Sequence, residues 1–251
     1  MMKLLLGLLV TSLLAGCASQ PASKDIEVKN IEGSTHTYIE SEKIDRFLVN
    51  KPEAFKQFDK VILFATQFDK LTISAKADKK MTANWNDSNW KEMDSICQQL
   101  DDFAKKIFSD YGDFVPVTRG GEDVLAIQFS LIDFMPYTAR YKNSGAGTVG
   151  VQTNNSGIGQ ITVRGVLANA KTGELVAVIE DTLEVNARNS SNGNLAAAQD
   201  GNSKAAQNLA WRTTFRRFID NLHAQLLILK KGNIKQGAIE HGAIEKGSRV
   251  R

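Results

Sequence analysis

Two stretches of this chain have the hydrophobic pattern of β-strands. Over residues 124–134, apolar side chains alternate with small or polar ones, which is the period of a strand with two different faces. Residues 60–66 are instead almost continuously apolar, and the pattern continues past Phe68 to residues 71–73. A short, nearly continuous apolar run is typical of a strand that is buried on both faces, and we expect this of the first strand.

A third segment has the period of an amphipathic helix. From residue 93 to residue 108, apolar side chains recur at intervals of three or four positions. Asn89, followed three residues later by Glu92, predicts a capping box at the start of this helix. Gly112 lies just past the last apolar position, where glycine commonly ends a helix.

A second amphipathic helix is predicted near the end of the chain. Its apolar stripe runs over residues 205–226 and includes Trp211. A shorter helix is expected at the start of the domain, over residues 38–48, because apolar side chains cluster there and Pro52 follows them.

The clearest local motif is a β-hairpin. Residues 160–167 and 174–180 read as strands, and the sequence Asn-Ala-Lys-Thr-Gly at residues 169–173 joins them. Gly173 can adopt the positive φ that such a turn requires.

These elements follow one another in the order β-α-β-β-β-α. A mostly antiparallel sheet with helices packed on one face buries them economically, so the sequence predicts an α+β fold. The domain is expected to span residues 36–230, between a polar tether at residues 17–35 and a flexible tail at residues 231–251.

The first sixteen residues have the pattern of a secretory signal peptide. Lys3 precedes an apolar segment at residues 4–13, and small residues follow it. The segment is too short to span a bilayer comfortably. The sequence Leu-Ala-Gly-Cys at residues 14–17 resembles the lipobox of bacterial lipoproteins. That resemblance implies cleavage between Gly16 and Cys17 and a lipidated Cys17, which would anchor the mature chain in a membrane. The alternatives are an ordinary signal peptide and an N-terminal anchor helix.

The residues after the lipobox indicate where the anchor would lie. Bacterial lipoproteins with Asp after the cysteine tend to stay at the inner membrane, whereas Ala18 and Ser19 follow it here. The resemblance therefore implies the outer membrane, with the domain on its periplasmic face.

Composition narrows the classes of partner. The net charge is +3, and removal of the first sixteen residues, which contain only Lys3 as a charged residue, leaves +2. We expect no nucleic-acid partner, because the sequence shows no dense basic stripe. If Cys17 carries lipid, Cys97 is the one cysteine left, so no internal disulfide can form. Cys97 lies on the apolar side of its helix and reads as a buried structural thiol.

No catalytic or metal site is predicted. The glycine-rich residues 145–150 match a dinucleotide fingerprint in letters, but a polar loop and a strand follow them instead of a helix. His36, His223 and His241 have no second histidine or cysteine at metal-ligand spacing. The adjacent carboxylates Asp101-Asp102 and Glu180-Asp181 would point to different faces or to solvent. We therefore expect no metal, no cofactor and no enzymatic activity.

Two groups of side chains are candidates for an interaction surface. Trp85 and Trp90 flank a polar run, an arrangement that suits recognition but also suits folding back onto the core. Arg212, Arg216 and Arg217 could contact an acidic partner or lipid head groups, or form a solvated helix face.

The hairpin and the last helix resemble DUF3313, a family of uncharacterised bacterial lipoproteins. The family turn reads Asp-x-x-Thr-Gly-Glu, and residues 169–174 match it except that Asn169 replaces the Asp; Trp211 matches the helix tryptophan. A more distant similarity is to the N-terminal domain of TolB and related envelope lipoproteins. The family carries no assigned active site, so the resemblance implies no catalytic residues.

The sequence thus favours a non-catalytic binding or adaptor protein of the cell envelope. Its partners would be the membrane, through the N-terminal lipid, and an envelope protein or cell-wall component. The alternatives are a periplasmic hydrolase with a dispersed site, which needs a pocket with converging polar groups, and a carrier of lipid or another amphiphile, which needs an apolar cavity between sheet and helices.

Overall fold

The computed structural model describes residues 26–30, 37–77, 87–136, 157–186, 204–232 and 234–236. The helical elements are the 3-10 helix η1 (Pro52–Gln57) and the α-helices α2 (Asp87–Tyr111) and α3 (Lys204–Lys231). The strands are β1 (Ile26–Asn30), β2 (Thr37–Ile39), β3 (Arg46–Val49), β4 (Lys60–Gln67), β5 (Thr72–Ile73), β6 (Val115–Pro116), β7 (Val124–Pro136), β8 (Gly157–Asn169), β9 (Leu175–Asn186) and β10 (Ile234–Gln236).

In the described part of the chain, all the strands belong to one sheet. Their order is β10-β1-β2-β3-β9-β8-β7-β4-β6, and β5 pairs with β7 beside this path. Most neighbours are antiparallel, while β4 is parallel to β6 and β7, β5 is parallel to β7, and β1 is parallel to β10. Helix α2 lies between β4 and β7 in the chain and provides the crossover that a parallel pair requires. The predicted α+β class is confirmed.

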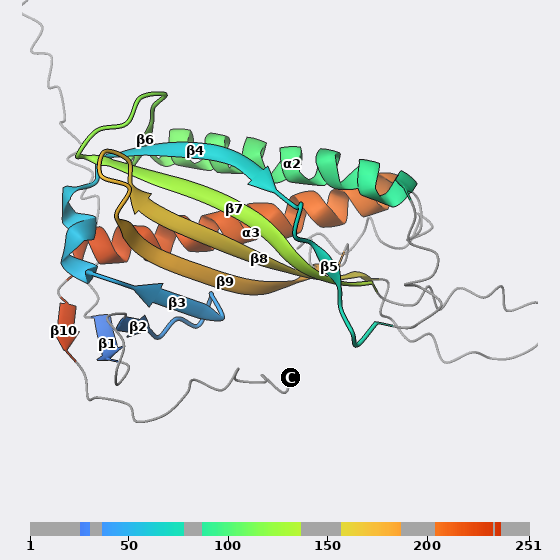
Figure 1. Cartoon of the computed structure of the whole chain (residues 1–251), viewed down its shortest axis with the longest axis horizontal. Helices are drawn as coiled ribbons and strands as arrows, with labels where there is room; N and C mark the ends of the chain where they lie inside the picture. Colours follow the sequence, from blue (N-terminus) through green and yellow to red (C-terminus); the bar gives the residue numbers. More distant parts are fainter. Residues whose placement is uncertain are drawn as a thin grey trace, which may run out of the picture.

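Strands β7, β8 and β9 form the long antiparallel centre of the sheet (Figure 1). The predicted hairpin joins β8 to β9. Gly173 has φ +71°, and the Asn169 carboxamide oxygen accepts hydrogen bonds from the backbone N–H groups of Lys171 and Thr172 at 2.9 and 3.0 Å. The turn is thus fixed by two residues of its own sequence, the glycine that tolerates the φ and the side chain that satisfies the turn N–H groups.

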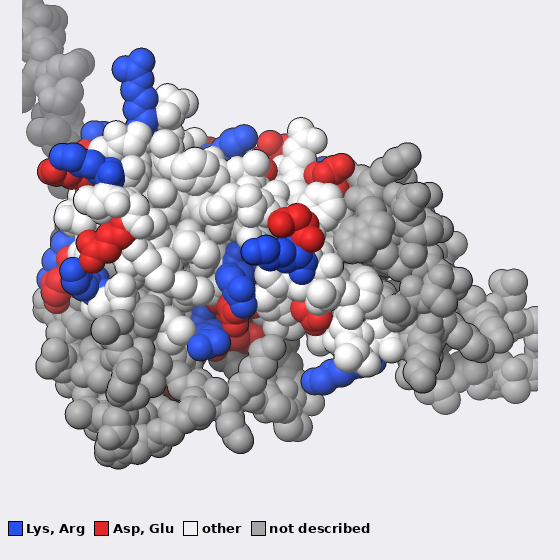
Figure 2. All heavy atoms as spheres, in the orientation of Figure 1, with Lys and Arg blue, Asp and Glu red and all other residues white. Residues whose placement is uncertain are grey.

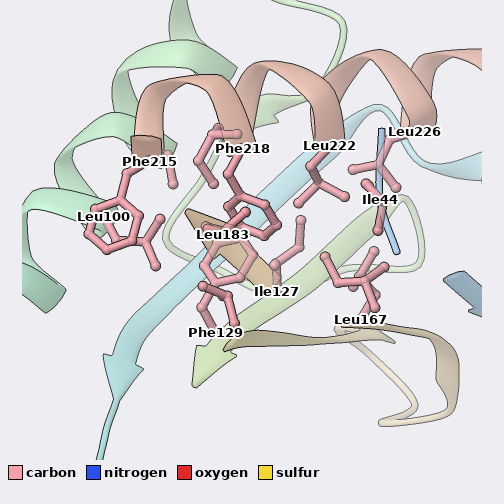
Figure 3. Close-up of a cluster of buried hydrophobic side chains, with 14 of the residues drawn as sticks. Ile44, Leu100, Ile127, Phe129, Leu167, Leu183, Phe215, Phe218, Leu222 and Leu226 are labelled. Carbon is pink, nitrogen blue, oxygen red and sulfur yellow. The ribbon is translucent and has the colours of Figure 1, made fainter. Parts of the chain in front are cut away.

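Helices α2 and α3 cover one face of the sheet, behind the strands in Figure 1. The core lies between these two layers. Phe129 of β7 contacts Phe218 of α3, with ring centroids 5.7 Å apart in an edge-to-face arrangement. Figure 3 shows how aromatic and aliphatic side chains from both layers fill this space: Ile44, Leu100, Ile127, Leu167, Leu183, Phe215, Leu222 and Leu226.

The predicted short helix at residues 38–48 is wrong. Residues 37–39 and 46–49 are the strands β2 and β3, which pair with each other, and β3 also pairs with β9. The side chains of Phe47 and Val49 are buried while Arg46 is exposed. The segment therefore follows the two-residue period of a strand, and the helical turn comes later, at η1.

The sheet also extends beyond the predicted domain at both ends. Strand β1 lies in the segment expected to be a tether, and β10 lies in the segment expected to be a tail. The two pair in parallel, Ile26 with Ile234, and β1 continues the sheet through β2. Strands this short gain stability from their neighbours in the sheet, so their own sequence shows little periodicity.

Two predicted boundaries shift. The apolar pattern over residues 60–73 divides into β4 and β5, separated by a turn in which the Leu71 N–H donates to the Phe68 carbonyl at 2.9 Å. Helix α2 begins at Asp87, two residues before the predicted cap at Asn89. It ends as predicted before Gly112, whose N–H donates to the Phe108 carbonyl at 3.3 Å.

Candidate functional site

The side of the sheet opposite the helices, here called the open face, carries an unusual number of apolar side chains. The side chains of Phe64 and Val115 are each 51% exposed, and that of Val166 is 39% exposed. Strand pairing aligns Phe64 with Gln128 and Gln128 with Val166, so these positions lie in one row across β4, β7 and β8. We call the following residues the apolar stripe: Leu48, Ile62, Phe64, Val115, Val166 and Val178.

The apolar stripe corrects the prediction that the first strand is buried on both faces. In β4, Val61 is fully buried beneath the helices, but Phe64 points to the open face. The reason is the topology, because both long helices pack on the same side, and among the described residues no helix covers the other side of β4.

A row of charged residues borders the apolar stripe. Pairing places Arg46 of β3 beside Glu180 of β9, and Glu180 beside Arg164 of β8. Arg164 donates from Nε and Nη2 to Glu180 Oε1 at 2.8 and 2.6 Å, and Arg46 Nη1 lies 3.6 Å from Glu180 Oε2. Two guanidinium groups therefore share one carboxylate. We call these three residues the arginine row.

A shallow hollow of about 470 Å³ lies on the side of the apolar stripe that is away from the arginine row. It is lined by residues 116–121 together with Lys60, Asp123 and Val124. Lys60 Nζ donates to Asp123 Oδ2 at 2.6 Å; this bond raises the pKa of Lys60 and lowers the pKa of Asp123. Arg119 adds an exposed cation at the rim.

Figure 2 shows the open face directly. Uncharged atoms cover much of its upper middle part, and Lys or Arg atoms lie beside Asp or Glu atoms near the middle. The arrangement combines exposed apolar surface with paired charges at its border, which is the composition of protein-binding surfaces.

The free edge of β4 is partly closed. The Asp101 carboxylate of α2 accepts hydrogen bonds from the Thr66 N–H at 3.0 and 3.2 Å and from the Thr66 hydroxyl at 2.5 Å. A side chain thus occupies the backbone donor that another strand would need, a common protection of sheet edges.

The structure places the predicted surface residues elsewhere. Arg212, Arg216 and Arg217 are exposed on α3, and Arg216 lies 3.8 Å from Asp220 in an i,i+4 ion pair. Trp90 belongs to α2, while Trp85 and Cys17 lie outside the described residues. The structure does not bring these arginines together with the open face. The open face itself was not predicted from the sequence.

Two buried groups can be compared with their predictions. Cys97 is buried as expected, and burial raises the pKa of its thiol to about 12. The adjacent carboxylates of β9 separate as expected: Glu180 lies on the open face, whereas Asp181 is buried and accepts the Asp45 N–H at 3.2 Å. His36, His241 and residues 145–150 lie outside the described residues.

His223 is the one histidine that the structure describes. Its imidazole is buried against Tyr111, Phe108 and Phe114, and within the described chain its Nε2 atom has no hydrogen-bond partner. Burial lowers the pKa of His223 below 6.5, although the carboxylate of Asp113, 3.9 Å from Nε2, opposes this effect. Asp220 also raises the pKa and Lys231 lowers it.

This burial predicts how stability depends on pH. The unfolded chain protonates this histidine near its ordinary pKa, whereas the folded state keeps it neutral to lower pH. The free energy of unfolding should therefore fall as pH drops below about 6.5. His223→Phe, which suits the surrounding rings, should reduce the slope between pH 7 and 5 in urea denaturation curves. An unchanged slope would show that His223 is not the group responsible.

The layer between sheet and helices bears on the carrier hypothesis. A lipid carrier needs an apolar cavity there, and in the described residues that layer contains closely packed rings and aliphatic side chains (Figure 3).

Among the described residues, no helix is both long and apolar enough to cross a membrane.

Comparison with known proteins gives distant similarities. No family model matches the chain, and no curated protein matches it. It is similar to the crystal structure of XCC0632 from Xanthomonas campestris, assigned to DUF330, with 13% identity over 68% of this chain and 84% of that one and a TM-score of 0.39. It is also similar to the PelC dodecamer from Paraburkholderia phytofirmans, with 11% identity over 66% and 89% and a TM-score of 0.30.

Proposed function

We propose that this chain is a lipoprotein of the bacterial outer membrane whose domain faces the periplasm. The proposal rests on the basic start, the apolar segment and the sequence Leu-Ala-Gly-Cys at residues 14–17, followed by Ala18 and Ser19. Several acyl chains on Cys17 would hold the protein stably, because one chain alone gives only marginal membrane binding. We further propose that it belongs with the DUF3313 lipoproteins that the turn at residues 169–174 resembles.

The proposed role is non-catalytic binding of another envelope protein. The observation that carries it is the open face, where Phe64, Val115 and Val166 are exposed beside paired charges. Exposed apolar side chains grouped on one face mark interaction sites more often than chance positions. A lipid anchor would hold this face in the periplasm.

The anchor is tested by replacing the lipidated residue. Cys17→Ala should abolish labelling of the protein by a radioactive fatty acid and leave it uncut or soluble, because the thiol that receives the lipid is gone. Cys97→Ala is the matched control, since Cys97 is buried in α2, and its label should be unchanged. Labelling that persists in Cys17→Ala would reject the proposal.

The choice of membrane has its own variant. Ala18→Asp should move the labelled protein from the outer to the inner membrane fraction in density-gradient separation. Equal distribution of the wild type and this variant would show that residue 18 does not direct the sorting.

A further inference from the structure

Cations outnumber carboxylates within the arginine row and among the charged residues that line the hollow. In the arginine row, two guanidinium groups share the single carboxylate of Glu180. At the hollow, Lys60 and Asp123 neutralise each other, while no ion pair among the described residues neutralises Arg119. The apolar surface therefore lies between two sites that each favour a negative charge.

The register of the sheet gives the distance between the two sites. Val124 pairs with Lys60 at the hollow, and Ser130 pairs with Arg164 in the arginine row. These pairs are six positions apart along β7, which corresponds to about 20 Å at the rise of a strand. An extended segment of about seven residues spans the same distance.

The charges decide between three possible occupants. A second copy docked on its own open face would bring one positive arginine row near another, which is repulsive. A membrane surface would have to take in the carboxylate of Glu180 together with the arginines, since Arg164 is bound to it by two hydrogen bonds. A protein segment can instead place carboxylates at the two sites and apolar side chains between them.

We propose that the open face binds an extended segment of another protein, with acidic residues at both ends and apolar side chains between them. The acidic residue at one end contacts Arg46 and Arg164, and the one at the other end contacts Arg119 at the hollow. This inference rests on the proposed function only in taking the open face as the binding surface. It adds the chemistry and the length of the partner segment.

The test is site-specific photocrosslinking in living cells that produce the full chain. The photoreactive residue p-benzoylphenylalanine replaces Phe64 in the apolar stripe, where it keeps an aromatic ring. The control position is Lys105, which is exposed on α2. Position 64 should yield a protein adduct that position 105 does not. Mass spectrometry of the adduct should identify a segment with acidic residues about six positions apart and apolar residues between them.

Charge variants in the arginine row make the test specific. A triple variant replaces all three residues of the arginine row by glutamine: Arg46→Gln, Arg164→Gln and Glu180→Gln. It removes the surplus positive charge and leaves no unpaired carboxylate, so it should lower the adduct yield about tenfold. Glu180→Gln alone increases the surplus and should raise the yield. Thermal denaturation of both variants shows whether they remain folded, and Glu180→Gln gives a change of opposite sign that misfolding cannot produce.

Four outcomes would overturn the inference. They are an adduct with lipid, an adduct with a second copy of this chain, a protein adduct whose yield ignores the charge variants, and no adduct above that at position 105. The fatty-acid label on Cys17 is measured in the same cells. Failure of the inference with the label retained leaves the anchor intact, whereas loss of the label contradicts the proposed function itself.

Discussion

Phe129→Ala is expected to lower the free energy of unfolding by about 3–5 kcal/mol. Phe129 is 1% exposed on the helix side of β7, and its ring contacts Phe218 edge to face. Truncation removes the transfer free energy of the ring and leaves a cavity that the surrounding sheet and helix cannot fill. Urea denaturation of the purified protein, followed by circular dichroism, measures the difference.

The same substitution on the other face is the matched control. Phe64 lies on the neighbouring strand β4, and its side chain is 51% exposed on the open face. Phe64→Ala should lower the free energy of unfolding by less than about 1 kcal/mol, since an exposed ring leaves little cavity. A loss equal to that of Phe129→Ala would mean that Phe64 is part of the core, and the open face would then have no exposed apolar stripe to offer a partner.

The contrast between these two phenylalanines shows why the site was hard to predict. The run from Val61 to Phe64 is apolar on both sides of the strand, so its sequence reads as doubly buried. A signal was present in the neighbouring strands, because Gln128 and Arg164 are polar at positions that share a face. Neighbouring strands of a sheet share the same two faces. The polar side chains of Gln128 and Arg164 therefore indicate that their face is exposed to solvent. Phe64 lies on that face and is exposed with them.

The local elements were predictable because their causes are local. The hairpin follows from Asn169 and Gly173, which lie within five residues of each other. Helices α2 and α3 follow from apolar stripes long enough for the period to be distinct. By contrast, β2 has three residues and β3 has four, and each is held by pairing with distant strands. Too few positions exist in them to separate a helical period from a strand period.

The arginine row could not be found in this way. Arg46 and Glu180 are 134 positions apart in the chain and come together only through the pairing of β3 with β9. The predicted cationic surface consisted of Arg212, Arg216 and Arg217 on one helix, and these residues are exposed on α3. Local clustering thus identified one exposed helix surface, while the mixed-charge row depends on a strand order that the sequence did not define.

The open face also depends on a close approach on the opposite side of the sheet. Gly165 lies between Arg164 and Val166, and a methyl group there would come within 2.6 Å of Ile179 Cγ1 and 2.8 Å of Ile179 Cδ1. Ile179 is fully buried on the adjacent strand β9. Gly165 therefore leaves room for Ile179 on the helix side of the sheet, while Arg164 and Val166 point to the open face.

Gly165→Ala should accordingly destabilise the protein by about 1–3 kcal/mol. In most strand positions alanine is at least as favourable as glycine, so the loss comes from the close contact. Ile179→Ala alone should cost about 2–5 kcal/mol. In the double variant the new methyl group occupies space that the isoleucine has vacated, so the loss should be smaller than the sum of the two. Chemical denaturation of the three variants gives this coupling free energy. Strict additivity would mean that the contact with Ile179 is not what requires a glycine between the two residues of the open face.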